Sequence, residues 1–299
     1  MRSSGCVTVP RMNDPRAGGT RFAVRNNVRV AYDPGPTPDS RNAGNAVILL
    51  HDLLADRSSF APLRDHLSNG HRVIAPDARG HGASATLANQ WYTVAELALD
   101  VLAIMDAEEI DVAHLAGHGL GGATAFELAR RQPERVATLT LLEPALHAIL
   151  DNDLDSRVVG LRNDLRTTDR AAGDAAYKGL VDKALDTYLG PRWGSGWRAQ
   201  TPRPRLGAIR RHAAALAGIA PALDAYTIAK NELRSFLVPV LLITGVDAPS
   251  VDRYVAIRLA ERLPVARHLE LPLANRAENP LGGDAAEPIA TAIEEHAAG

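Results

Sequence analysis

The sequence of 299 residues contains one cysteine, Cys6, so neither a disulfide framework nor a cysteine-rich metal site can form. A cytoplasmic location is therefore expected. The formal net charge is only −2, which gives no electrostatic support for binding nucleic acid or a membrane surface. No run of about 20 apolar residues is present to span a bilayer, and residues 1–19 lack the apolar core of a signal peptide.

Histidines and carboxylates do not cluster at the spacing of metal ligands, so we expect no metal. No cofactor is expected either. The composition is otherwise that of a folded domain, with 46% hydrophobic and 23% charged residues. A chain of this length can form one large α/β domain or a domain with an inserted subdomain.

Short apolar runs alternate with helical patterns along most of the chain. This alternation predicts an α/β fold, with a mostly parallel sheet and helices on both faces. A hairpin is expected to precede it, with strands 21–25 and 28–32 turning at Asn26 and Asn27. The later predicted strands are 46–50, 72–75, 112–116, 136–142, 240–244 and 268–271.

The strand pattern stops after Ala145. Residues 146–235 have helical periodicity, with helices predicted at 171–189, 206–216 and 219–237, and they indicate an inserted helical cap. The core would then comprise 20–145 and 236–299. Residues 1–19 are expected to form a disordered N-terminal arm.

A glycine-rich turn, G-H-G-L-G-G at 117–122, joins a predicted strand to a predicted helix. It satisfies the G-x-G-x-x-G pattern of dinucleotide-binding proteins, and Glu143 follows at about the spacing that a ribose-binding acid needs. Such a fingerprint normally opens its domain, whereas this turn follows at least two earlier strands. A dinucleotide site is therefore disfavoured.

Five motifs follow one another along the chain: L-L-H at 49–51, D-A-R-G-H-G-A-S at 77–84, G-H-x-x-G-G at 117–122, L-L-I-T-G at 241–245 and E-N-P at 278–280. Their order and spacings resemble the α/β-hydrolase superfamily, specifically its cap-bearing hydrolase and haloperoxidase-like branch. The resemblance implies that the turn at 117–122 is the elbow that carries the nucleophile at its centre.

Carried over position by position, the resemblance leaves all three triad positions vacant. The nucleophile position is Gly119 and the acid position is Ala248, with Asp247 one residue too early. Counting back from Glu278 places the base at Leu273; counting forward from the last strand places it at Arg276, beside Asn275. Acyl transfer by this fold needs a nucleophile, a base and an orienting acid.

The backbone N–H groups of the site remain available whichever side chains the positions carry. The resemblance implies N–H donors of an oxyanion hole at Leu120 and Leu53. Asp52 stands where the family usually has glycine, and it is the candidate acid or base, the alternative being a solvated or loop-capping carboxylate. Further candidates for binding substrate are His118, Glu143, Asn275 and Arg276, each with a structural role as the alternative.

The predicted cap gathers arginines around Trp193 and Trp197. We expect some of these arginines to pair with acids of the core. The alternative is that one or two bind an anionic ligand, with the tryptophans as an apolar wall. The arginines are Arg192, Arg198, Arg203, Arg205, Arg210 and Arg211.

The leading interpretation is a non-hydrolytic enzyme that binds a small organic, possibly natural-product, molecule between core and cap. Non-covalent acid–base or conformational catalysis would drive epimerisation, isomerisation, elimination or cyclisation. The alternatives are a small-molecule-binding protein without turnover and a hydrolase whose carboxylate activates water. Serine-hydrolase activity is not expected, and a homodimer is left open.

Overall fold

The computed structural model describes residues 19–36, 46–68, 70–85, 92–151, 153–274 and 278–299. The predicted N-terminal arm lies almost wholly outside these residues. Eight strands form one sheet in the order β1-β2-β4-β3-β5-β6-β7-β8, which is parallel from β4 to β8. The strands are β1 Arg21–Arg25, β2 Val28–Asp33, β3 Ala46–Leu50, β4 Val73–Pro76, β5 Ala113–His118, β6 Val136–Leu142, β7 Val240–Gly245 and β8 Ala266–Leu271.

The predicted α/β architecture is confirmed, including its opening hairpin. β1 and β2 are antiparallel, and both turn residues have positive φ, 50° at Asn26 and 63° at Asn27. Asparagine tolerates this conformation, which the two-residue turn of a hairpin requires. The central strands are buried throughout, and β3 has all five of its residues in the core.

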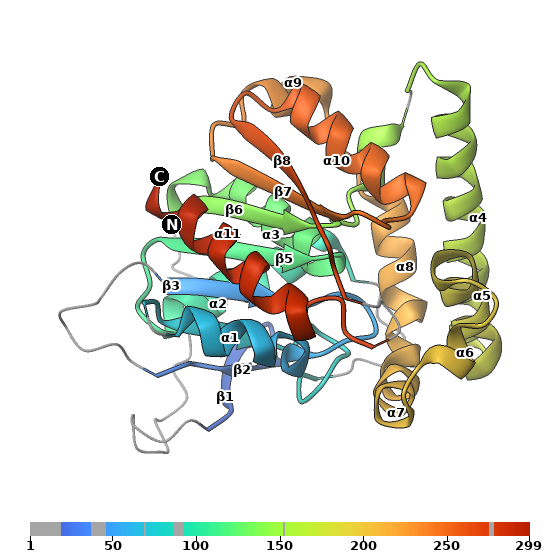
Figure 1. Ribbon diagram of the computed structural model, residues 1–299. Coiled ribbons are helices and arrows are strands. Elements are labelled where there is room, and N and C mark those ends of the chain that lie inside the picture. Colours follow the sequence, from blue (N-terminus) through green and yellow to red (C-terminus); the bar gives the residue numbers. More distant parts are fainter. Residues whose placement is uncertain (1–18, 37–45, 69, 86–91, 152, 275–277) are drawn as a thin grey trace.

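Helices cover both faces of this sheet (Figure 1). On one face lie α1 Ala61–Leu67 and α11 Ala286–Ala298, which pack against each other. The other face carries α2 Val94–Ala107, α3 Leu120–Arg131 and α10 Ser250–Arg262. Side chains of a strand point alternately to the two faces, so β3 supplies Ile48 to one core cluster and Leu49 to the other.

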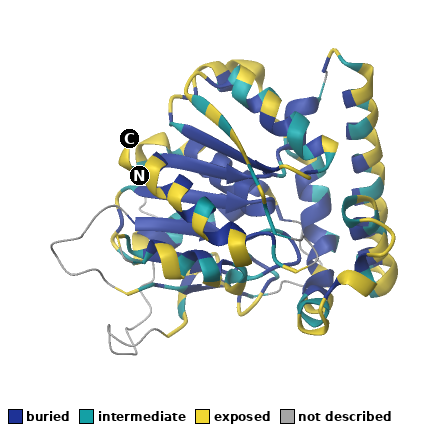
Figure 2. Ribbon diagram, viewed as in Figure 1, coloured by how far each residue is buried: buried dark blue, intermediate teal, exposed yellow. Residues whose placement is uncertain are grey.

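Most of the chain between β6 and β7 forms a helical layer beyond the carboxyl ends of the strands (Figure 1), and its last short helix returns to the C-terminal end of α3, where Glu232 pairs with Arg130. α8 is largely buried, whereas α4 exposes its outer face (Figure 2). The helices are α4 Ser156–Tyr177, α5 Val181–Trp193, α6 Trp197–Gln200, α7 Arg203–His212, α8 Leu216–Ala225 and α9 Lys230–Arg234.

The predicted single helix at 171–189 is wrong, because the chain breaks there into α4 and α5. Gly179 lies at the break with a φ of 72°, a conformation that ends helices and favours glycine. The helix predicted at 219–237 is also divided. α8 ends at Ala225, and Tyr226 turns extended so that its hydroxyl donates to Glu127 at 2.8 Å.

Candidate functional site

The turn between β5 and α3 has the sharp geometry of a nucleophile elbow. Gly119 stands between the last residue of β5 and the first of α3 with φ 51° and ψ −112°. Its N–H donates to Leu142 O at 3.0 Å, and its carbonyl accepts from Ala145 at 2.9 Å. Side chains rarely adopt this conformation, so glycine removes a strain of about 1–3 kcal/mol.

The space beside Gly119 is filled by the side chain of Asp52. A Cβ atom added at Gly119 would lie 1.8 Å from Asp52 Oδ1. The same oxygen accepts a hydrogen bond from the N–H of Leu120 at 2.8 Å, at the N-terminus of α3. Free N–H groups and the helix dipole favour a negative charge there. The carboxylate therefore occupies the place of the side chain that the elbow lacks.

Two hydrogen bonds to the backbone carbonyl of Asp52 hold the loop that carries this residue. The carbonyl of Asp52 accepts from His51 Nδ1 at 2.8 Å and from the N–H of Ala55 at 3.1 Å. Leu53 follows and is buried. Of the two backbone donors predicted for an oxyanion hole, the Leu120 N–H is thus already engaged by Asp52.

The predicted acid and base positions lie beside the ends of β7 and β8. Ala248 is buried in the turn after β7, and its N–H donates to Gly245 O at 2.9 Å. A Cβ atom on Gly245 would lie 3.4 Å from Leu273 Cδ1 and 3.2 Å from Glu143 Oε1. The side chains of Leu273 and Glu143 therefore both lie against Gly245. Asn275 and Arg276 lie outside the described residues.

Glu143 and His118 come together at the elbow. Glu143 follows β6 directly with a positive φ of 43°, and its Oε1 accepts from the N–H of Gly245 at 3.0 Å. Its Oε2 lies 3.9 Å from His118 Nε2. Positive φ in a non-glycine residue is strained and is concentrated at functional sites. Both side chains are nearly buried, so they border the site from its β6 side.

Three histidines join the core loops to the cap. The His51 and His81 ring centroids are 5.1 Å apart, and those of His81 and His212 are 5.3 Å apart. In each ring Nε2 accepts a backbone N–H: Ala78 for His51 at 2.9 Å, Leu54 for His81 at 3.3 Å and Gly82 for His212 at 3.1 Å. Burial lowers the pKa of all three rings, which favours the neutral acceptor form.

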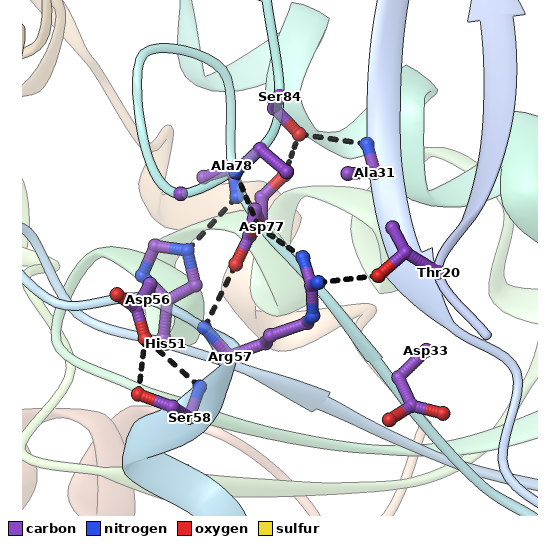
Figure 3. A network of polar contacts seen from close by, with 12 residues as sticks. Thr20, Ala31, Asp33, His51, Asp56, Arg57, Ser58, Asp77, Ala78 and Ser84 are labelled. Carbon is purple, nitrogen blue, oxygen red and sulfur yellow. Dashed lines mark hydrogen bonds and ion pairs between the residues drawn. The ribbon is translucent and has the colours of Figure 1, made fainter. Parts of the chain in front are cut away.

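Asp77 anchors the loop beside these three histidine rings, of which Figure 3 shows His51. It is buried, and its carboxylate accepts from the N–H of Arg57 at 2.9 Å, from the N–H of Ala83 at 2.8 Å and from the Arg57 guanidinium. The next residue, Ala78, donates to His51 (Figure 3). These contacts are structural, and they fix the loop from which Asp52 projects.

The cap contributes residues that sequence reasoning missed. Tyr188 in α5 is almost fully buried, and burial raises its pKa. The positive charge of Arg192 opposes this rise in pKa, whereas the negative charge of Asp52 adds to it. The Arg192 guanidinium lies 4.0 Å from the Tyr188 ring centroid and donates to Asp169 at 2.7 Å. In the sequence Tyr188 is a tyrosine within a helical pattern, and nothing in that pattern predicts that its side chain is buried.

The tryptophans and three of the six arginines make their contacts within the cap itself. Trp197 is 1% exposed, lies T-shaped against Trp193 at 6.3 Å and donates to Asp186 at 3.2 Å. Some of the arginines were expected to pair with core acids, but Arg192, Arg198 and Arg210 pair with cap acids instead. Each of these acids lies in a different helix from its arginine, so the pairs tie the cap helices to one another.

Two kinds of site are not found in the described part of the chain. None of its helices is both long and apolar enough to cross a membrane. Its histidine, cysteine and acidic side chains form no group of three or more that could hold a metal ion.

Curated relatives include proteins named as hydrolases. Over 100 residues the chain is 42% identical to a putative carbamate hydrolase RutD of Variovorax paradoxus, covering 33% of this chain but only 38% of that protein. With the RutD protein of Azorhizobium caulinodans, the identity is 27% over 241 residues, which cover 77% of this chain and 83% of that protein. The chain spans 27–38% of the first four curated relatives that it matches.

The fold also matches solved structures. The crystal structure of the enol-lactonase from Burkholderia xenovorans LB400 superposes with a TM-score of 0.69 at 21% identity, covering 93% of this chain and all of that one. At this identity the likeness concerns the fold. The model of the family described as alpha/beta hydrolase fold matches residues 45–276. The chain therefore belongs to the α/β-hydrolase fold family.

Proposed function

We propose that the chain is a non-hydrolytic enzyme in which Asp52 moves a proton on a small organic substrate. The observation that carries the proposal is the Asp52 carboxylate, which fills the nucleophile's place beside Gly119 and accepts from Leu120 at 2.8 Å. A carboxylate so placed can act on the atom that a serine would otherwise attack. The vacant positions Ala248 and Leu273 support loss of the whole triad rather than of serine alone.

The two oxygens of the Asp52 carboxylate have different proposed roles, which follow from their contacts. Oδ1 is oriented by the Leu120 N–H, so Oδ2 is the oxygen available to take or return a proton. Epimerisation, isomerisation, elimination and cyclisation each need this kind of proton transfer without a covalent intermediate.

A second candidate is hydrolysis by water that Asp52 activates. It is favoured by the names of the relatives, which include a putative carbamate hydrolase and an enol-lactonase. A third, binding without turnover, is favoured by the engaged Leu120 N–H, because Asp52 already satisfies the donor that a substrate oxyanion would use.

The first experiment separates these reaction classes. Purified protein is offered p-nitrophenyl butyrate before and after treatment with a fluorophosphonate. Under the proposal there is no ester hydrolysis and no fluorophosphonate labelling. Hydrolysis that survives the treatment and disappears in Asp52→Asn would replace the proposal with the water-activating hydrolase.

The second experiment tests proton transfer directly. Small molecules that co-purify are identified by mass spectrometry and incubated with the enzyme in D₂O, and loss of a C–H signal is followed by NMR. We expect Asp52→Asn to slow exchange by at least 100-fold, since amide nitrogen and oxygen are poor bases. Asp65→Asn, an exposed carboxylate on α1, is the matched control and should exchange like the wild type. Unaltered exchange in Asp52→Asn contradicts the proposal.

A further inference from the structure

The strand β8 forms one edge of the sheet, and within the described part of the chain it pairs only with β7. All six residues of β7 are buried, whereas none of β8 is, as the exposed and intermediate colours of β8 in Figure 2 show. Leu269 is 37% exposed, and Val265, which precedes the strand, is 46% exposed. An edge strand is a template for another strand, and β8 contains neither proline nor lysine to prevent such pairing.

The backbone of β8 divides into groups that face β7 and groups that face outward. The N–H of Val240 donates to Val265 O at 2.9 Å, and the N–H of Val246 donates to Leu271 O at 3.0 Å. In a parallel ladder every second residue bonds to the same neighbour, so the carbonyls of residues 267 and 269 also face β7. The N–H and C=O groups that point away from the sheet therefore belong to Ala266, His268 and Glu270.

We propose that β8 pairs antiparallel with β8 of a second copy of this chain, so that the two eight-stranded sheets join about a two-fold axis. This inference is independent of the proposed activity. Pairing of an edge with itself is isologous, so it closes at a dimer and leaves no β8 edge exposed. The outward-facing N–H and C=O groups gain partners, and the exposed side chain of Leu269 gains a second sheet to pack against.

The side chains of β8 select one register for this pairing. Two registers overlap most of the strand, because outward-facing residues must lie opposite one another. In the first, His268 lies opposite His268 of the second copy and Leu269 lies opposite the charged Arg267. In the second, His268 lies opposite Glu270 in both directions, and the two Leu269 side chains meet at the axis. Hydrogen-bonded and apolar cross-strand pairs stabilise antiparallel strands, so the second register is favoured. Thr244 Oγ1 lies 2.8 Å from His268 Nε2, which leaves Nδ1 to bond the glutamate.

The proposed pairing leaves both candidate sites accessible. Antiparallel strands run in opposite directions, so the carboxyl ends of the two parallel sheets lie at opposite ends of the dimer. The cap helices α4 to α8 lie beyond the carboxyl ends in each copy (Figure 1). The pairing therefore does not place one cap against the other.

The first test is sedimentation velocity of the full chain at concentrations up to about 100 µM. The wild type should sediment with twice the mass of one chain. Leu269→Lys sets two like charges opposite each other at the axis and should weaken the dimer at least 100-fold. Leu154→Lys, the same change at a fully exposed leucine outside the sheet, should dimerise like the wild type. A wild type that is monomeric at about 100 µM overturns the inference, as does a Leu269→Lys variant that dimerises like the wild type.

The second test addresses the register with two variants whose changes lie on half-exposed or exposed side chains, His268→Glu and Glu270→Lys. Each variant alone sets like charges or two cations opposite each other and should weaken its homodimer at least tenfold. Mixed together they should form a heterodimer, because the introduced lysine then faces the introduced glutamate and the unchanged His268 faces the unchanged Glu270. Native mass spectrometry distinguishes the heterodimer from both homodimers.

The control for the second test is Glu134→Lys, the same charge reversal at an exposed acid between α3 and β6, which should dimerise like the wild type. Homodimers of His268→Glu or Glu270→Lys as tight as the wild type overturn the inference. A mixture of the two that yields no heterodimer also overturns it, because the proposed register requires the introduced charges to meet.

Discussion

The two ends of α3 hold a carboxylate in different ways. In its C-terminal half, Glu127 is 1% exposed and its carboxylate accepts from Arg130 at 2.8 Å, from Tyr226 at 2.8 Å and from Arg131. At its N-terminus, the half-buried carboxylate of Asp52 accepts one hydrogen bond within the described part of the chain, from the N–H of Leu120.

The difference separates a carboxylate that holds the fold together from the one that we propose acts on a substrate. Glu127 ties α3 to its own last turn and to the end of α8, and both of its oxygens accept hydrogen bonds. Removing the Glu127 carboxylate should therefore destabilise the fold strongly, and removing the Asp52 carboxylate only slightly.

The largest effect is expected at Glu127. Glu127→Ala leaves Arg130 and Arg131 without their common partner and Tyr226 without its acceptor, so the free energy of unfolding should fall by about 3–5 kcal/mol. Urea denaturation measures this loss. Glu134→Ala, an exposed acid just beyond α3, should change stability by less than about 0.5 kcal/mol. An equally small loss of unfolding free energy in Glu127→Ala would contradict the distinction between the two ends of α3.

Gly119→Ser should cost about 3 kcal/mol, because it combines an unfavourable φ with displacement of Asp52 from Leu120. In the Asp52→Gly background only the backbone strain remains, so the cost should fall by at least about 1 kcal/mol. The control is Gly160→Ser, at an exposed helical glycine with nothing within 4 Å of an added Cβ, which should not destabilise. Equal costs of Gly119→Ser in both backgrounds would show that Asp52 does not occupy this space.

The smallest effect concerns pH. His212 has a lowered pKa in the folded state through burial and the nearby His51 and Arg211, with Asp56 opposing. The unfolded chain therefore binds its proton first, and stability falls as pH drops below about 6.5, by at most about 1.4 kcal/mol per pH unit for each such ring. His212→Gln keeps an acceptor for Gly82 and should flatten this slope by up to about 1 kcal/mol between pH 6.5 and 5.5.

The control for that measurement is His66→Gln, an exposed histidine on α1 whose substitution should leave the slope unchanged. Unfolding free energies of the wild type and both variants are compared across the same pH range. If the free energy of unfolding falls equally with pH in His212→Gln and in the wild type, the neutral His212 ring does not contribute to the loss of stability in acid.

Most of the fold could be predicted from the sequence, because its signals are local. The buried run at Ala46–Leu50, the paired asparagines of the hairpin and the glycines of the elbow each report on their own backbone. The glycine at the centre of the elbow is visible in the sequence itself. The break at Gly179 was missed because helical periodicity continues on both sides of it.

The chemistry of the site depends on contacts between distant residues. Asp52 and Leu120 are 68 positions apart, so the sequence offers Asp52 as a candidate without showing which N–H it meets. The burial of Tyr188 within the cap also exists only in the folded chain. The pairing of cap arginines with cap acids likewise follows from helix packing that periodicity does not report.

The carboxylate beside Gly119 also constrains how this chain can change over evolutionary time. A side chain acquired at 119 would meet the Asp52 carboxylate, because an added Cβ would lie 1.8 Å from Oδ1. Position 119 can therefore gain a side chain at low cost only after Asp52 has been replaced by a smaller residue or has moved. Substitutions at these two positions, 67 residues apart in the sequence, are coupled, and their order matters.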